Sequence, residues 1–201
     1  MKGPIKKLSS QNSEVFLTFD DGPDINLTSR VLETLSRFGA QATFFVIGEK
    51  AKKNPLVIDK IKKGGHSIGD HSLNHNYSYF FKSQRELKNW VETGNKTLTH
   101  LLGEPPVGFR SPAGVVTPPL KRVMGELSTP WIHWNKRFFD TNLPFSWTQS
   151  FHKLNSGDIV LLHDCQKAAL RESFMRGLES LLSQGIEQGL SFQAITKERL
   201  I

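Results

Sequence analysis

Short apolar runs alternate with longer amphipathic stretches along most of the chain. The stretch from Leu27 to Phe38 repeats apolar residues at the period of about 3.6 that is typical of a helix packed on one side. Similar spacing predicts further helices, over residues 50–63, 83–102, 117–126 and 168–188. Runs rich in β-branched and aromatic residues predict buried strands, over residues 14–20, 42–48, 67–71, 107–110, 129–134, 158–164 and 191–196. This alternation predicts a parallel α/β sheet with right-handed crossovers, either doubly wound or closed as a barrel.

The length and composition of the chain fit one domain. Its 201 residues, of which 37% are apolar, are enough for one substantial core, and no low-complexity linker divides them. We expect an N-terminal extension over residues 1–12 and a single domain over residues 13–201. The longest apolar runs fall far short of the roughly 20 residues that a membrane helix needs, so no membrane span is expected.

The first residues of the chain bear on its localisation. The residues from Met1 to Lys7 are partly basic, but no apolar segment follows them, so they do not form a signal peptide. A leader could have been removed from the chain, and in that case we expect the cell envelope or secretion.

The net charge of +7 is spread over many lysines. It fits attraction to an anionic polymer such as a cell wall, and equally an ordinary solvated surface. No motif supports nucleic-acid binding, and we expect a monomer. Cys165 is the only cysteine, so no intrachain disulfide can form. Its position beside His163 allows a nucleophile, but a small residue after a strand is the simpler interpretation.

Two adjacent carboxylates follow the first predicted strand. Asp20 and Asp21 stand between the apolar run that ends at Phe19 and the turn residues Gly22-Pro23. Side by side they repel each other and are costly to bury without a partner, so a cation is expected nearby.

His71 and His75 can supply the other ligands of that cation. Their i,i+4 spacing predicts both imidazoles on one side of a helical turn. Two histidines with one carboxylate are a common catalytic zinc set that leaves a fourth position open for water. Zinc is therefore the expected metal, although cobalt or nickel would also suit these ligands. The alternative for the pair alone is an ordinary exposed helix face.

Two further strand ends carry polar chemistry. Arg110-Ser111-Pro112-Ala113-Gly114 follows one apolar run, and His163-Asp164 ends another. With these the chain closely resembles the polysaccharide deacetylase family, the NodB-like carbohydrate esterases, whose ordered motifs are TFDDGP, H(S/T)xxH, RxPxG and a late strand ending in LxHD. All four occur here in that order between Asp20 and Asp164.

The resemblance implies a distorted (β/α) barrel with seven or eight parallel strands. In a barrel the carboxyl ends of all strands converge on one mouth, so polar residues far apart in sequence can share a site. It also implies a metal-dependent hydrolase that removes N-acetyl groups from an N-acetylglucosamine-containing glycan, of peptidoglycan or chitin type, by attack of a metal-bound water.

Matching positions to the family motifs implies a role for each residue. Asp20 corresponds to the general base, and Asp21 to the metal ligand that acts with His71 and His75. His163 is the candidate general acid that protonates the departing sugar amine. The remaining matches are the base-orienting Arg110 and the acid-orienting Asp140.

The fourth family motif, usually Asp-Trp, is altered in this chain, and this bears on the substrate contacts. Thr141 stands where Trp is expected, and Trp147, Phe138 and Phe139 are candidates to replace it. The other candidate substrate contacts are the backbone of Ala113 for the oxyanion, Leu161 for the acetyl methyl, and Tyr77 or Tyr79 for sugar stacking. Leu161 could equally fill the barrel, and the aromatic residues could equally be packing residues.

Two alternatives remain beside N-deacetylation. One is a related acyl hydrolase that acts on xylan acetyl esters, formyl amides or small cyclic amides. The other is a catalytically silent carbohydrate-binding relative, which is disfavoured because such a module needs neither Asp20 nor His163. The histidines outside the motifs are expected to be satisfied or exposed: His66, His100, His133 and His152.

Overall fold

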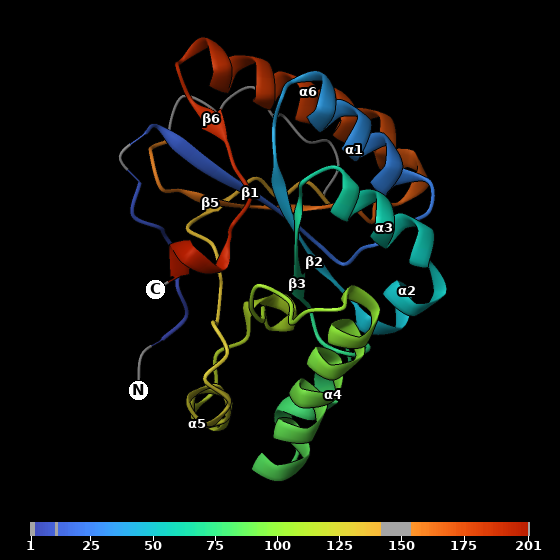
Figure 1. The fold of residues 1–201 in the computed structure, drawn as a ribbon, viewed down its shortest axis with the longest axis vertical. Coiled ribbons are helices and arrows are strands. Elements are labelled where there is room, and N and C mark those ends of the chain that lie inside the picture. Colours follow the sequence, from blue (N-terminus) through green and yellow to red (C-terminus); the bar gives the residue numbers. More distant parts are fainter. Residues whose placement is uncertain (1–2, 11, 142–153, 201) are drawn as a thin grey trace.

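A parallel sheet with helices around it forms the body of the protein (Figure 1). The computed structural model describes residues 3–10, 12–141 and 154–200. The strands in these ranges are β1 (Glu14–Asp20), β2 (Ala42–Val46), β3 (Ser67–Asp70), β4 (Lys136–Arg137), β5 (Ile159–His163) and β6 (Ser191–Phe192). The α-helices are α1 (Leu27–Arg37), α2 (Gly48–Lys53), α3 (Pro55–Lys63), α4 (Gln84–Leu102), α5 (Pro118–Leu127) and α6 (Arg171–Glu187).

The strands run in the order β3-β2-β1-β5-β4, and β6 pairs with the start of β1. Beyond β3, Phe109 forms parallel bridges to Asp70 on one side and Trp131 on the other. The segment that starts at Trp131 continues into β4, which pairs with β5 at the opposite edge of the sheet. These contacts join the two edges into a distorted barrel, as the fold prediction required.

The predicted strands over 107–110 and 129–134 are reduced to isolated bridges, so the described residues do not form all of the seven or eight regular strands expected. Proline explains this, because Pro130 lacks an N–H for a ladder and Pro112 ends the extended segment that contains Phe109. The predicted strand over 191–196 is regular only in β6.

The predicted helix over 50–63 is two helices. Pro55 has no N–H and stands at the first position of α3, so the chain breaks between α2 and α3. The other predicted helices lie within a few residues of α1, α4, α5 and α6. Among the described helices, none is both long and apolar enough to cross a membrane.

Alternation along β1 decides which of its side chains reach the interior. Its odd-numbered residues from 15 to 19 belong to the main hydrophobic core beneath α1, α3 and α6, which lie together on one side of the sheet in Figure 1. Phe16 belongs to a second cluster inside the barrel, and Thr18 and Asp20 face that interior, where Arg110 bonds to both. A strand of strict period two therefore carries the core on one face and the site on the other.

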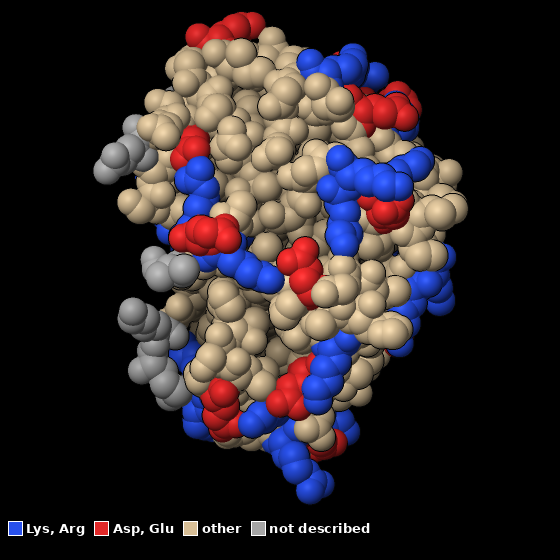
Figure 2. All heavy atoms as spheres, viewed as in Figure 1, with Lys and Arg blue, Asp and Glu red and all other residues tan. Residues whose placement is uncertain are grey.

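The N-terminal segment packs against the barrel, and the charged residues are mixed over one face of the surface. Near the N-terminus, Ile5 bridges to Ile132 and Leu8 is buried in the interior cluster. Figure 2 shows Lys and Arg interspersed with Asp and Glu over one face, so the net charge of +7 forms no continuous basic stripe there.

Candidate active site

An ion pair between Asp20 and Arg110 forms the floor of the site. Arg110 Nη1 lies 2.7 Å from Asp20 Oδ1, and the arginine is completely buried. The same guanidinium donates to Thr18 Oγ1 at 2.7 Å and to the carbonyls of Ile132 and His133 at 3.1 and 2.9 Å. Burial lowers the pKa of Arg110, and the Asp20 carboxylate opposes that shift. A side chain held at every nitrogen has one orientation available, so the position of Asp20 is fixed with it.

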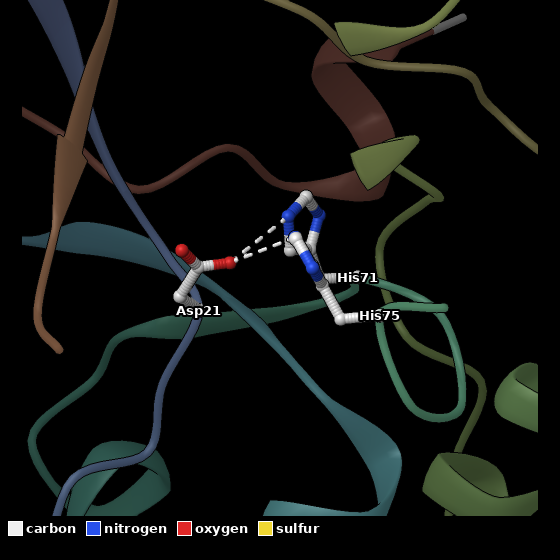
Figure 3. Close-up of side chains that lie close together, drawn as sticks. All are labelled: Asp21, His71 and His75. Carbon is white, nitrogen blue, oxygen red and sulfur yellow. Dashed lines mark ion pairs between the residues drawn. The ribbon is translucent and has the colours of Figure 1, made fainter. Parts of the chain in front are cut away.

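Asp21, His71 and His75 form a triad beside this pair (Figure 3). Asp21 Oδ1 lies 3.4 Å from His71 Nε2 and 3.1 Å from His75 Nε2, and both imidazoles point at the carboxylate. One ligand atom from each residue lies within 4.8 Å of the others. His71 Nδ1 lies 2.9 Å from the carbonyl oxygen of Arg110, which orients the ring with Nε2 toward Asp21.

The two histidines lie on a loop, so the predicted helical turn is wrong. Ser72 and His75 have φ of 73° and 56°, in the left-handed region. The Ser72 N–H donates to Asp70 Oδ1 and the His75 N–H donates to Ser72 Oγ. These side-chain bonds fold the segment back on itself and bring the imidazoles together without a helix.

The triad fits a divalent cation. Asp21 Oδ1 is buried and accepts no hydrogen bond among the described residues, although two imidazole nitrogens face it. Burial alone would raise the pKa of Asp21, but His71 and His75 hold it well below its usual range. A buried carboxylate oxygen that accepts no hydrogen bond from the described residues and lies opposite two imidazole nitrogens is the arrangement that a metal ion completes.

His163 ends β5 and is held by Asp140. His163 Nδ1 lies 2.9 Å from Asp140 Oδ1, and the His163 backbone N–H donates to Asp140 Oδ2 at 2.7 Å. Burial lowers the pKa of His163, but the Asp140 hydrogen bond and charge outweigh it and raise the value to about 9. Gln166 also donates to Asp140 Oδ2, at 3.0 Å. The sequence analysis missed Gln166, because nothing distinguishes it from other polar residues that follow a strand.

One cavity of about 170 Å³ brings these groups together. Asp20, Asp21, His71, His75 and His163 all line it, although they come from the ends of β1 and β5 and from the loop after β3. The other lining residues are Tyr77, Ala113, Trp134, Arg137, Thr141 and Leu161. The structure thus brings the predicted base, ligands and acid to one place.

Trp134 is a wall of the cavity that the sequence analysis did not assign. Its ring stacks on His133 at 5.4 Å and lies 5.5 Å from the Arg110 guanidinium. Two of the candidates to replace the Trp of the fourth family motif do not line the cavity. Phe138 is buried in the main core, and Phe139 is exposed outside the cavity. Trp147 lies outside the described residues.

The remaining predicted contacts separate into lining and packing residues. Tyr77, Ala113 and Leu161 line the cavity. Tyr79 instead stacks on Trp90 at 5.0 Å, within the core between α4 and α5. Cys165 lies outside this cavity, and Lys50 Nζ donates to its sulfur at 3.3 Å.

The other described histidines are satisfied or exposed. His66 Nδ1 accepts from the Ala42 N–H, and His133 Nε2 lies 3.1 Å from Ser111 Oγ. Burial lowers the pKa of both His66 and His133 to about 4. His100 is exposed on α4, and His152 lies outside the described residues.

Fold and site together define a distorted α/β barrel in which two histidines and one carboxylate are placed so that they could hold a metal ion. The family model for polysaccharide deacetylase matches residues 7–130. The chain belongs to the polysaccharide deacetylase family, as its motifs predicted.

Two curated relatives are similar over most of the chain. A peptidoglycan-N-acetylglucosamine deacetylase of Bacillus cereus is 30% identical over 188 residues, covering 91% of this chain and 86% of the relative. The peptidoglycan-N-acetylglucosamine deacetylase PgdA of Listeria monocytogenes is 33% identical over 190 residues, covering 93% of this chain. The match spans only 40% of the Listeria protein.

Solved structures share the fold. The Bc1960 peptidoglycan N-acetylglucosamine deacetylase superposes with a TM-score of 0.84 and 27% identity, over 98% of this chain and 91% of that one. A pseudoenzyme of carbohydrate esterase family 4 from Bacillus anthracis gives a TM-score of 0.84 with 22% identity, over 99% of this chain and 69% of that one. At 22% identity, the similarity to this pseudoenzyme concerns the fold alone.

Proposed function

We propose that this protein is a metal-dependent hydrolase that removes N-acetyl groups from an N-acetylglucosamine-containing glycan. The observation that carries the proposal is the single cavity lined by the Asp20 carboxylate, the Asp21, His71 and His75 triad, and the His163 imidazole. Amide hydrolysis needs a base for the attacking water and an acid for the departing amine, and this cavity supplies one candidate for each.

Asp20 is the proposed general base. Its Oδ1 is bound to Arg110, and its Oδ2 lies 3.7 Å from His71 Nε2, at the edge of the triad. A water beside the triad is thus within reach of the free oxygen. A positioned base of this kind contributes roughly 10² to 10⁴ in rate.

His163 is the proposed general acid. With a pKa raised to about 9, its imidazole is protonated at neutral pH and can deliver a proton to the leaving nitrogen. Asp140 fixes the ring through Nδ1, so the proton available to substrate is the one on Nε2. Trp134 and Leu161 line the same cavity and are the proposed walls of the acyl pocket.

Asp21, His71 and His75 are proposed to hold zinc, with cobalt or nickel as the other suitable metals. When bound, such an ion polarises the amide carbonyl and lowers the pKa of a coordinated water toward about 7. Ala113 lines the cavity, and its backbone N–H is the proposed additional donor to the oxyanion.

The relatives narrow the substrate class. Their names describe deacetylases of peptidoglycan N-acetylglucosamine, and a relative from Azorhizobium caulinodans is named a chitooligosaccharide deacetylase. We propose a glycan of one of these types. A silent binder is less well supported, because the acid and base are both present and each has its orienting partner, Asp140 and Arg110.

Acetate release from N-acetylglucosamine oligomers and from peptidoglycan tests the proposal. Protein stripped of metal should be inactive and should recover with zinc, while Asp20→Asn and His163→Ala should each lose roughly 10² or more in kcat. Zinc content measured on the same Asp20→Asn preparation separates loss of the base from loss of the metal. A protein that binds zinc stoichiometrically yet releases no acetate from any N-acetyl glycan would contradict the proposal.

A further inference from the structure

Arg137 brings a positive charge to the wall of the site cavity. It lines the same cavity as Asp20 and His163, and it is exposed. In the described part of the chain no carboxylate pairs with it, whereas its neighbour Lys136 pairs with Asp158 at 3.7 Å. The segments outside the description contain no Asp or Glu. Among the described residues the Arg137 guanidinium therefore has no carboxylate partner, and it is available to a ligand in this cavity.

Strand pairing sets the position of this charge. β4 pairs in parallel with β5, in a register that places Arg137 beside Leu161. Leu161 and His163 alternate to the same face of β5, and both line the cavity. Paired residues of neighbouring strands share a face, so Arg137 is presented to the cavity from a regular backbone position.

The ring of Phe139 supports the guanidinium. Arg137 Cζ lies 4.4 Å from the ring centroid, so the flat face of the guanidinium is taken up by this cation–π contact. Phe139 has a φ of 55°, which a bulky residue seldom adopts, and its ring is held where 52% of the residue stays exposed. A cation–π contact uses the face of a guanidinium and leaves its N–H groups for hydrogen bonding, and the fork of N–H groups matches a carboxylate.

We infer that Arg137 is a specificity-determining residue that binds a carboxylate carried by the glycan next to the N-acetylated sugar. The inference rests on the proposed deacetylation and refines its substrate to an anionic glycan. In peptidoglycan such a carboxylate has two sources, the lactyl group of the neighbouring sugar and the stem peptide attached to it. A chitin-type oligomer is neutral and offers no carboxylate.

Three tetrasaccharides of equal length test the inference: an N-acetylglucosamine oligomer, a peptidoglycan fragment freed of stem peptides, and the same fragment with its peptides. The measured quantity is kcat/KM for acetate release, expressed as the ratio of each anionic substrate to the neutral one. In Arg137→Gln this ratio should fall about 3- to 10-fold, the size of a charge-assisted hydrogen bond at a partly exposed site. The ratio for Arg137→Lys should lie between those of the wild type and Arg137→Gln. The fragment whose ratio falls identifies the source of the carboxylate.

Arg85→Gln is the matched control. Arg85 is exposed on α4 and does not line the cavity. Arg85→Gln removes the same charge as Arg137→Gln, so this variant should keep the substrate ratio of the wild type. The inference would be overturned if Arg137→Gln had the same substrate ratio as the wild type, or if the ratio fell equally in Arg85→Gln. Acetate release by the wild type would still support deacetylation in either case. If the wild type released no acetate from any of the three tetrasaccharides, both the inference and the proposed deacetylation would be overturned.

Discussion

Arg110 and Asp20 form an ion pair inside the barrel, with 2.7 Å between Arg110 Nη1 and Asp20 Oδ1. The arginine side chain has no exposed surface and that of Asp20 is 4% exposed. Neither group can return to water if its partner is removed. The proposed base is therefore held by a buried ion pair that is costly to break from either side.

Removing Arg110 alone should be strongly destabilising. Arg110→Met keeps similar bulk but leaves the Asp20 carboxylate buried without its cation, so we expect a loss of about 3–5 kcal/mol in the free energy of unfolding. The double variant Arg110→Met, Asp20→Asn should recover part of that loss, because it also removes the stranded charge. Urea denaturation of both variants measures the difference. Arg85→Met on the surface of α4 should change stability by less than about 0.5 kcal/mol, and an equally small effect at Arg110 would contradict the assignment.

The His163–Asp140 pair should set the alkaline limit of activity. The pKa of His163 is raised to about 9, so its acid form is present at neutral pH and is lost as the pH rises through that value. Its contribution to stability has the same sign, because the folded pKa lies above the ordinary value of 6.5: it is fully present below that value and lost as the pH approaches 9.

Asp140→Asn should move this limit to lower pH. Without the Asp140 charge, only the smaller effects of Asp20 and Asp21 oppose the lowering of the His163 pKa by burial, so the descending limb of the kcat profile should shift toward pH 6.5. A pH series of acetate release on wild type and Asp140→Asn measures the shift. Superimposable profiles would show that His163 is not the group whose protonation limits the rate.

Metal removal should affect stability as well as activity. Zinc that binds only the folded triad stabilises it by mass action, about 4 kcal/mol at a thousandfold excess over Kd. We expect chelated protein to melt at lower temperature and zinc to restore the transition. His75→Ala should abolish the zinc-dependent shift, while His100→Ala, an exposed histidine on α4, should preserve it. A full zinc response in His75→Ala would argue against the triad.

The residues of the proposed chemistry could be predicted from sequence because they follow recognisable strands. Asp20, Arg110 and His163 stand at the ends of apolar runs, and parallel strands bring such ends to one mouth whatever their separation along the chain. Thr18 and Asp20 share the interior face because alternation in a strand is local and has a period of two.

Features that depend on distant contacts could not be predicted. The spacing of His71 and His75 suited a helix, but the loop between them is fixed by Asp70 and by the carbonyl of Arg110. Trp134 reaches the cavity because the segment that starts at Trp131 closes the barrel, a pairing that no local pattern records. Proline shortened the strands beside Phe109, which the apolar run alone did not indicate.

Gly114 is the residue that allows Trp134 to line the cavity. A Cβ at Gly114 would lie 2.5 Å from Trp134 Cη2, and the glycine has a φ of 66°. Gly103, at the end of α4, offers a matched comparison: its φ is 76°, and a Cβ there would meet no heavy atom within 4 Å. Both glycines carry the same backbone requirement, but only Gly114 adds contact with the cavity wall.

The pair Gly114→Ala and Gly103→Ala should therefore separate backbone strain from displacement of the tryptophan. Each should lose about 1–2 kcal/mol of stability from an L side chain in the left-handed region, and Gly114→Ala should lose about 1–3 kcal/mol more from overpacking against Trp134. Because Trp134 borders the space next to Asp20 and His163, Gly114→Ala should also lower kcat/KM for acetate release about tenfold, whereas Gly103→Ala should leave it near the wild-type value. Urea denaturation and acetate release on the two variants provide both measurements. Equal kcat/KM values would mean that the position of Trp134 has no bearing on how the acyl group is bound, and the wall of the proposed acetyl pocket would then have to be sought elsewhere.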